Sequence, residues 1–140
     1  MSQGHDKALP GKSVIVCSGL LVCALLLAGC ASELRTEPAE LSPLTPDTAT
    51  SRLRLDYSVD VRLDSGYSRT LRAGTVWKRV GTIPEGEVWE PVDTVLTVEG
   101  RYLHEAYLVV KESRLVGFYL PVEDAFLPLR PSLLLKFTTT

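Results

Sequence analysis

The feature that most constrains the fold is a strict two-residue alternation over positions 53–64. Every odd-numbered residue there is apolar and every even-numbered residue is polar. Successive side chains of a strand point to opposite faces, whereas a helix would spread the same apolar residues around its circumference. The segment is therefore predicted to be one strand with a buried odd face, with Val59 and Val61 inaccessible to water and Asp60 solvated. Ser65-Gly66 predicts the turn that ends it.

Short extended segments separated by Gly and Pro fill the rest of the chain. Strands are expected at 67–71, 75–80, 87–90, 94–98, 103–111, 115–120 and 132–138. A turn-rich connection is expected at 81–86, and a single helical turn at 122–126 before Pro128. No ten-residue segment has helical periodicity together with capping residues. The pattern predicts an all-β fold, a small antiparallel barrel or sandwich.

Two parts of this region are similar to bacterial SH3-like domains. Leu71-Arg72-Ala73-Gly74 and then 80–88 resemble the strand and diverging turn that open that family's fold. The segments 107–110 and 115–120 resemble its closing hairpin. The resemblance covers about 55 residues, from 71 to 126. It departs from the family pattern because the usual Gly-Pro after the arginine is missing and the aromatic residue after Gly117 is not tryptophan. The resemblance implies an SH3-like sandwich.

A different composition marks the start of the chain. Lys7 and Lys12 precede Ser13–Ala28, sixteen residues without a charge. As a helix this run would be about 24 Å long, which is shorter than the ~30 Å hydrocarbon core of a bilayer. A basic start followed by a short apolar run is typical of a secretory signal peptide rather than of a membrane span.

The apolar run ends in Leu27-Ala28-Gly29-Cys30, which resembles the lipobox of bacterial lipoproteins at all four positions. In that family the cysteine sulfur receives a diacylglycerol, and a lipoprotein signal peptidase cuts before the cysteine. The resemblance implies that residues 1–29 are a cleaved signal peptide, with the cut between Gly29 and Cys30, and that Cys30 is the lipidated first residue. The next residue, Ala31, is not the Asp that retains such proteins at the inner membrane. An outer-membrane location, facing the periplasm, is implied.

Residues 30–51 are expected to be the lipidated cysteine followed by a flexible tether. Residues 31–51 contain three prolines, several Ser and Thr, and no aromatic residue. Proline removes a backbone donor and fixes φ, so no hydrophobic period survives here. Residues 52–140 are then the globular domain. An ordered segment packed on the domain is the alternative for this stretch.

The cysteine count and the charge limit the chemistry of the mature protein. Of three cysteines, two lie in the predicted signal peptide and Cys30 carries the lipid, so no internal disulfide is expected. The formal net charge is −2, with 15 Lys and Arg against 17 Asp and Glu. This balance argues against nucleic acid as a partner, because nucleic-acid binders are basic.

No catalytic constellation can be assembled from the remaining residues, and we expect no metal and no cofactor. His104 is the last histidine, and position 108, where a zinc-protease helix would place a second one, is Leu. No serine lies in a nucleophile-elbow pattern. The candidate binding residues are Trp89, Tyr102 and His104. Trp89 is the aromatic residue most expected to be exposed, because charged residues flank it.

These observations favour a non-enzymatic module, anchored to a membrane by lipid, that binds or scaffolds an envelope protein or the peptidoglycan wall. Two alternatives remain open. One is an enzyme of unknown class that acts on cell wall or lipid. The other is a structural subunit of an envelope complex, in which exposed strand edges add to a partner's sheet.

Overall fold

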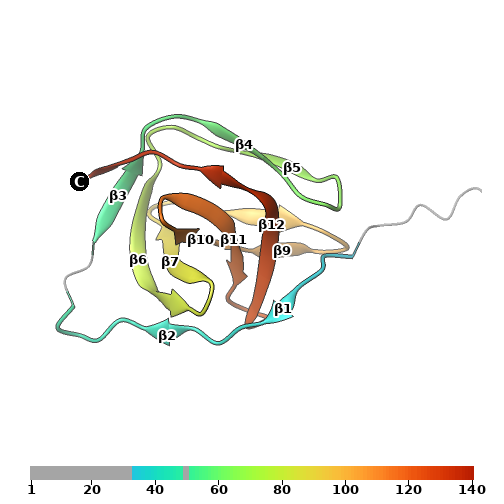
Figure 1. The fold of residues 1–140 in the computed structure, drawn as a ribbon, viewed down its shortest axis with the longest axis horizontal. Coiled ribbons are helices and arrows are strands. Elements are labelled where there is room, and N and C mark those ends of the chain that lie inside the picture. Colours follow the sequence, from blue (N-terminus) through green and yellow to red (C-terminus); the bar gives the residue numbers. More distant parts are fainter. Residues whose placement is uncertain (1–32, 49–50) are drawn as a thin grey trace, which may run out of the picture. The chain divides into compact units, whose positions relative to one another are not determined.

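The computed structural model describes residues 33–48 and 51–140. These residues contain strands, turns and loops but no helix, and every strand pair is antiparallel (Figure 1). The predicted all-β class is confirmed. Within the described ranges, no helix long and apolar enough to cross a membrane is found.

Thirteen strands lie within the described residues. Their bounds are β1 Glu37–Pro38, β2 Ser42–Pro43, β3 Arg52–Leu55, β4 Val59–Arg62, β5 Ser68–Leu71, β6 Val76–Ile83, β7 Gly86–Pro91, β8 Thr97–Glu99, β9 Leu103–Glu105, β10 Tyr107–Lys111, β11 Arg114–Leu120, β12 Ala125–Leu134 and β13 Phe137–Thr139.

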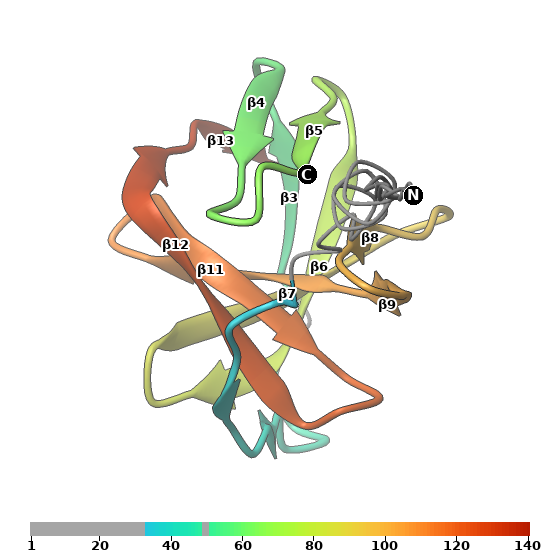
Figure 2. The same ribbon diagram turned by 90° about the vertical axis from the view of Figure 1, so that its right-hand side faces the viewer.

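The main sheet has the strand order β1-β12-β11-β10-β7-β6-β3-β13, and β2 pairs with β6. Its middle is built from neighbouring hairpins, with β6 on β7 and β10 on β11. Glu112 and Ser113 connect β10 to β11 with φ values of 51° and 63°, the left-handed conformation that a two-residue hairpin turn of the I′ type requires. Two small hairpins, β4–β5 and β8–β9, lie outside the sheet path (Figure 2).

The central strands are buried on both faces. In β10, Leu108 belongs to the larger hydrophobic cluster, and its neighbour Val109 belongs to a second, smaller cluster. In β11, Phe118 and Tyr119 divide between the clusters in the same way. Because consecutive side chains of a strand point to opposite faces, the two clusters lie on opposite sides of the sheet. A continuous apolar run such as 106–110 requires this two-sided cover.

The segment 33–48, which we call the arm, covers the second face. Ala39 is buried in the smaller cluster and Leu41 packs against it. Strand β1 pairs with β12 and β2 pairs with β6, while the amide of Ala39 donates to the Asp124 carbonyl at 3.0 Å. In Figure 1 the arm runs in cyan past both of its pairing partners.

The predicted flexible tether is therefore wrong for residues 33–48, and the predicted domain start at residue 52 is too late. The compact unit that holds the domain spans Ala31–Thr140. The three prolines do not prevent pairing, because β1 and β2 are two-residue edge strands, where a missing donor costs little. Gly81 on β6 permits the close approach of β2, since a Cβ there would overlap the Ser42 carbonyl oxygen.

The alternating segment 53–64 forms two strands, β3 and β4, instead of the one predicted. The odd face still points inward: Leu55 and Val61 are 1% and 2% exposed, and Asp60 is exposed as expected. Val59 is only half-buried, and Tyr57 is 63% exposed at the break between the strands. Strand β3 belongs to the main sheet, whereas β4, after the break, pairs only with β5. The alternation of apolar and polar residues continues through the break and does not reveal it.

Two further local predictions are wrong. The helical turn at 122–126 is a tight turn followed directly by β12, which continues through Pro128. Pro128 is tolerated because β1 pairs only with Ala125 and Phe126, so beyond them β12 is an edge strand on that side. The connection expected at 81–86 is mostly strand, because β6 extends to Ile83 and β7 begins at Gly86.

If the arm completes the second core, a charge placed under it should destabilise the fold. We expect Ala39→Asp to lower the free energy of unfolding by about 2 kcal/mol or more, because it buries a carboxylate in an apolar cluster. Ser42→Asp is the matched control, since it adds the same charge to the arm at an exposed position and should cost about 0.5 kcal/mol or less. Urea denaturation of both variants measures the difference. Equal stabilities would mean that the arm is not part of the folded core.

Two tyrosines under the second face give the fold a pH dependence. Burial and the nearby carboxylates raise the pKa of Tyr107 and of Tyr119 to about 12, and Tyr119 donates a hydrogen bond to Asp124 at 2.7 Å. The unfolded pKa is 10.0, so their stabilisation is complete below pH 10 and is lost as the pH rises towards 12.

We therefore expect a late phenolate absorbance step, accompanied by loss of stability, between pH 10 and about 12. Tyr119→Phe should shrink this late step, whereas Tyr102→Phe, which changes an exposed tyrosine, should leave it unchanged. A spectrophotometric titration checks this. Full ionisation of all tyrosines at the ordinary pH for phenols would contradict it.

Candidate functional site

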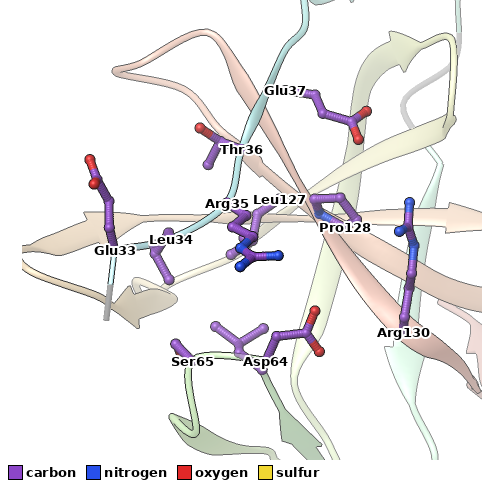
Figure 3. A pocket seen from close by; sticks show the side chains of 11 residues that line it. Glu33, Leu34, Arg35, Thr36, Glu37, Asp64, Ser65, Leu127, Pro128 and Arg130 are labelled. Carbon is purple, nitrogen blue, oxygen red and sulfur yellow. The ribbon is translucent and has the colours of Figure 1, made fainter. Parts of the chain in front are cut away.

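A groove of about 920 Å³ lies between the arm, the tip of the β4–β5 hairpin and strand β12 (Figure 3). The arm contributes residues 33–37, the hairpin contributes 63–65, and β12 contributes Leu127, Pro128 and Arg130. The groove is thus made by three segments that are distant in the sequence.

The groove exists because β12 is longer than its partner on this side. Strand β1 pairs with β12 only at Ala125 and Phe126, and within the described residues no strand takes the next positions on that edge. The arm residues 33–36 line the groove beside this edge but do not pair with it. A free strand edge offers backbone donors and acceptors to another extended chain.

Charged side chains of both signs surround this edge. Arg35 and Arg130 bring guanidinium groups, while Glu37 and Asp64 bring carboxylates (Figure 3). All four residues are exposed, and none of them takes part in an ion pair with another described residue. A guanidinium group binds a carboxylate in a two-pronged geometry, and a carboxylate accepts from an amide or an ammonium group. The groove can therefore bind a polar ligand that carries both signs of charge.

A smaller cavity of about 210 Å³ lies on the other side of the arm. It shares Glu33, Leu34 and Thr36 with the groove. Its remaining lining residues are Arg101, Tyr102, His104, Leu120 and Glu123. The Nδ1 atom of His104 lies 2.5 Å from Oε1 of Glu123, which pairs the β8–β9 hairpin with the turn before β12.

The structure brings two of the three candidate binding residues together. Tyr102 and His104 line the same small cavity, and Tyr102 is 70% exposed. Trp89 is not exposed, as the sequence suggested, but is 4% exposed in the larger core. It lies on β7 opposite Leu108, in the middle of the sheet. The side chains of the residues next to it in the sequence point to the opposite face of the sheet, so their charge does not describe the environment of Trp89. Gly29 and Cys30 lie outside the described residues.

The chemistry of the small cavity is limited. No serine lines it among the described residues, and its hydroxyl groups belong to Thr36 and Tyr102. The described part of the chain also contains no group of three or more His, Cys, Asp or Glu side chains arranged to hold a metal ion. The residues present favour binding through charge and hydrogen bonds.

Sequence reasoning missed the groove itself. Its arm residues fall in the predicted tether, and its β12 residues fall between the predicted helical turn at 122–126 and the predicted strand at 132–138. One signal was available: Pro128, Arg130, Pro131 and Ser132 interrupt the apolar residues of this strand, and proline and charge are typical of an exposed strand edge. The hairpin tip at 63–65 could not be linked to this edge without the tertiary structure.

Comparison of the chain with known protein families, curated proteins and solved structures finds no match. The likeness of residues 71–126 to SH3-like domains and the likeness of 27–30 to a lipobox therefore remain predictions from the sequence. Function has to be argued from the site and its surroundings.

Proposed function

We propose that this protein is a lipid-anchored envelope lipoprotein that binds an extended segment of an envelope protein along the free edge of β12. The free edge at the floor of a charged groove is the observation that carries the binding proposal. The lipobox-like sequence at 27–30 supports the anchor.

The anchor rests on the position of the motif as well as on its residues. Leu27-Ala28-Gly29-Cys30 lies at the end of sixteen uncharged residues, where a signal peptidase would cut. A single acyl chain holds a protein to a membrane only marginally, at ~0.8 kcal/mol per buried CH₂. The several chains that bacterial lipoproteins carry on one cysteine make the attachment permanent. Ala31 at the next position favours the periplasmic face of an outer membrane.

The groove favours an extended polypeptide over other ligands. An added strand would form main-chain hydrogen bonds with β12, and specificity would come from its side chains. Arg35 and Arg130 would take acidic side chains, while Glu37 and Asp64 would take basic ones. Pro128 and Pro131 both lack a backbone donor, and the pairing of β12 with β11 is irregular between Pro128 and Leu133, so an added ladder would be short. Peptidoglycan, whose short peptides also carry both charges, is the second ligand to be tested.

Replacement of the anchoring cysteine should abolish lipidation. We expect Cys30→Ser to remain an uncleaved precursor without a diacylglycerol, because the thiol is the acceptor of the lipid. Cys23→Ser is the matched control, since it removes a thiol from the same apolar run but should leave processing unchanged. Intact-protein mass spectrometry of membrane-purified protein measures both. An unmodified Cys30 in the wild-type protein would refute the anchor.

Photo-crosslinking tests the groove. A benzophenone amino acid at Ser65, inside the groove, should capture a discrete envelope protein in intact cells, whereas the same probe at Ser113, in the β10–β11 turn, should not. Arg130→Glu should lower the Ser65 adduct about tenfold, because a charge-assisted hydrogen bond contributes roughly 1.5–3 kcal/mol. Arg54→Glu, at an exposed position of β3 outside the groove, is the control.

The outcomes distinguish the two ligands. A protein adduct of defined mass that resists muramidase supports the proposal. An adduct that muramidase digests identifies peptidoglycan instead. Equal adducts from Ser65 and Ser113 would show that the groove is not the binding site.

A further inference from the structure

The arm limits how far the folded domain can lie from the residue that would carry the lipid. Four peptide units separate Cys30 from Leu34. Each residue spans at most about 3.3–3.6 Å, so this connection reaches no more than about 14 Å. The tether expected from the sequence would have let the domain stand well clear of the bilayer. Because Leu34 packs in the fold, only the four peptide units between Cys30 and Leu34 can separate the domain from the lipid.

Leu34 is held by specific packing. It is half-buried and packs against the larger core. Its side chain also lies against Gly100 at the tip of the β8–β9 hairpin, where a Cβ on Gly100 would overlap it. The point at which the chain leaves the domain towards Cys30 is therefore beside that hairpin tip.

The same tip exposes large apolar side chains. Tyr102 and Leu103 are 70% and 66% exposed, and Arg101 precedes them. Among the described residues, nothing covers these two neighbouring side chains. Tyrosine is enriched at the membrane–water interface, where its ring lies among the headgroups and its hydroxyl stays hydrated. Arg101 is suited to lipid phosphates, with its aliphatic stem along the apolar surface.

We infer that residues 100–103 of the β8–β9 hairpin insert into the headgroup region of the bilayer that holds Cys30, so that the domain rests on the membrane in one orientation. This inference depends on the proposed lipidation of Cys30. The occupant of this surface is lipid, because the short connection keeps the tip near the anchored cysteine. Contacts that would be weak for a free protein become effective when the anchor makes them intramolecular.

The inference also orients the binding groove. Leu34 lines the groove as well as the small cavity beside the tip. A partner segment on β12 would therefore approach close to the membrane surface, as the juxtamembrane segment of another envelope protein would.

A fluorescent probe at the tip tests this arrangement. Full-length protein carrying Leu103→Cys is purified in its processed, lipidated form, labelled with the environment-sensitive dye NBD, and reconstituted into vesicles of phosphatidylethanolamine and phosphatidylglycerol. Leu134→Cys is the matched control: Leu134 is 67% exposed, like Leu103, but lies at the far end of β12 from the residues that line the groove with Leu34. Nitroxide-labelled lipid serves as the quencher.

We expect the emission of the Leu103 probe to shift to the blue and to be quenched several-fold more than that of the Leu134 probe. Tyr102→Asp in the same labelled protein should remove most of the difference. Equal quenching of the two probes, with no blue shift at Leu103, would overturn the inference.

The wild-type protein separates this outcome from failure of the anchor. If Cys30 carries lipid, the processed wild type has no free thiol and takes up no dye. Dye uptake by the wild type would refute the lipidation on which the inference depends. An unlabelled wild type together with a probe that stays in water would refute the membrane contact alone.

Discussion

Burial of both faces of the central sheet is the constraint on which the rest of this structure depends. Strands β7, β10, β11 and β12 carry apolar side chains on consecutive positions, as in 106–110 and 115–120. One face closes over the larger core with the help of the small hairpins. The other face would expose Val88, Val109, Tyr119 and Phe126 to water if nothing covered it. A chain of this size has few segments left for that task, and the arm performs it.

The position of the arm then determines where the candidate sites lie. Pairing of β1 with only the first residues of β12 leaves the rest of that edge free, and the arm forms one wall of the groove beside it. The same residues separate the groove from the cavity that holds Tyr102 and His104. Because Leu34 is packed between them, the start of the domain, the groove and the exposed hairpin tip are parts of one region. A purely flexible tether would have left these features independent of one another.

Many of the strands could be predicted from local sequence patterns, and the predictions that were wrong have physical causes. The alternation at 53–64 correctly identified the inward side chains Leu55 and Val61, but not the break at Tyr57, where the chain passes from one sheet to another. The charged residues that flank Trp89 do not reveal its burial, because neighbours in a strand point to opposite faces. Tyr102 is a candidate binding residue from the sequence, but its position in one cavity with Leu34 depends on contacts across the fold.

The sequence by itself determined the all-β class, most of the strands and the inward faces of the alternating ones, since a period of two is a property of neighbouring residues. It also carries the lipobox-like motif, which is a linear signal. Only the tertiary structure decided that the proline-containing arm belongs to the domain, that β12 keeps a free edge, and that Leu34 packs beside Gly100. These three features depend on which distant segment of the chain covers an apolar face of the sheet. Short edge strands such as β1 and β2 are stabilised almost entirely by that cover, and not by any pattern of their own.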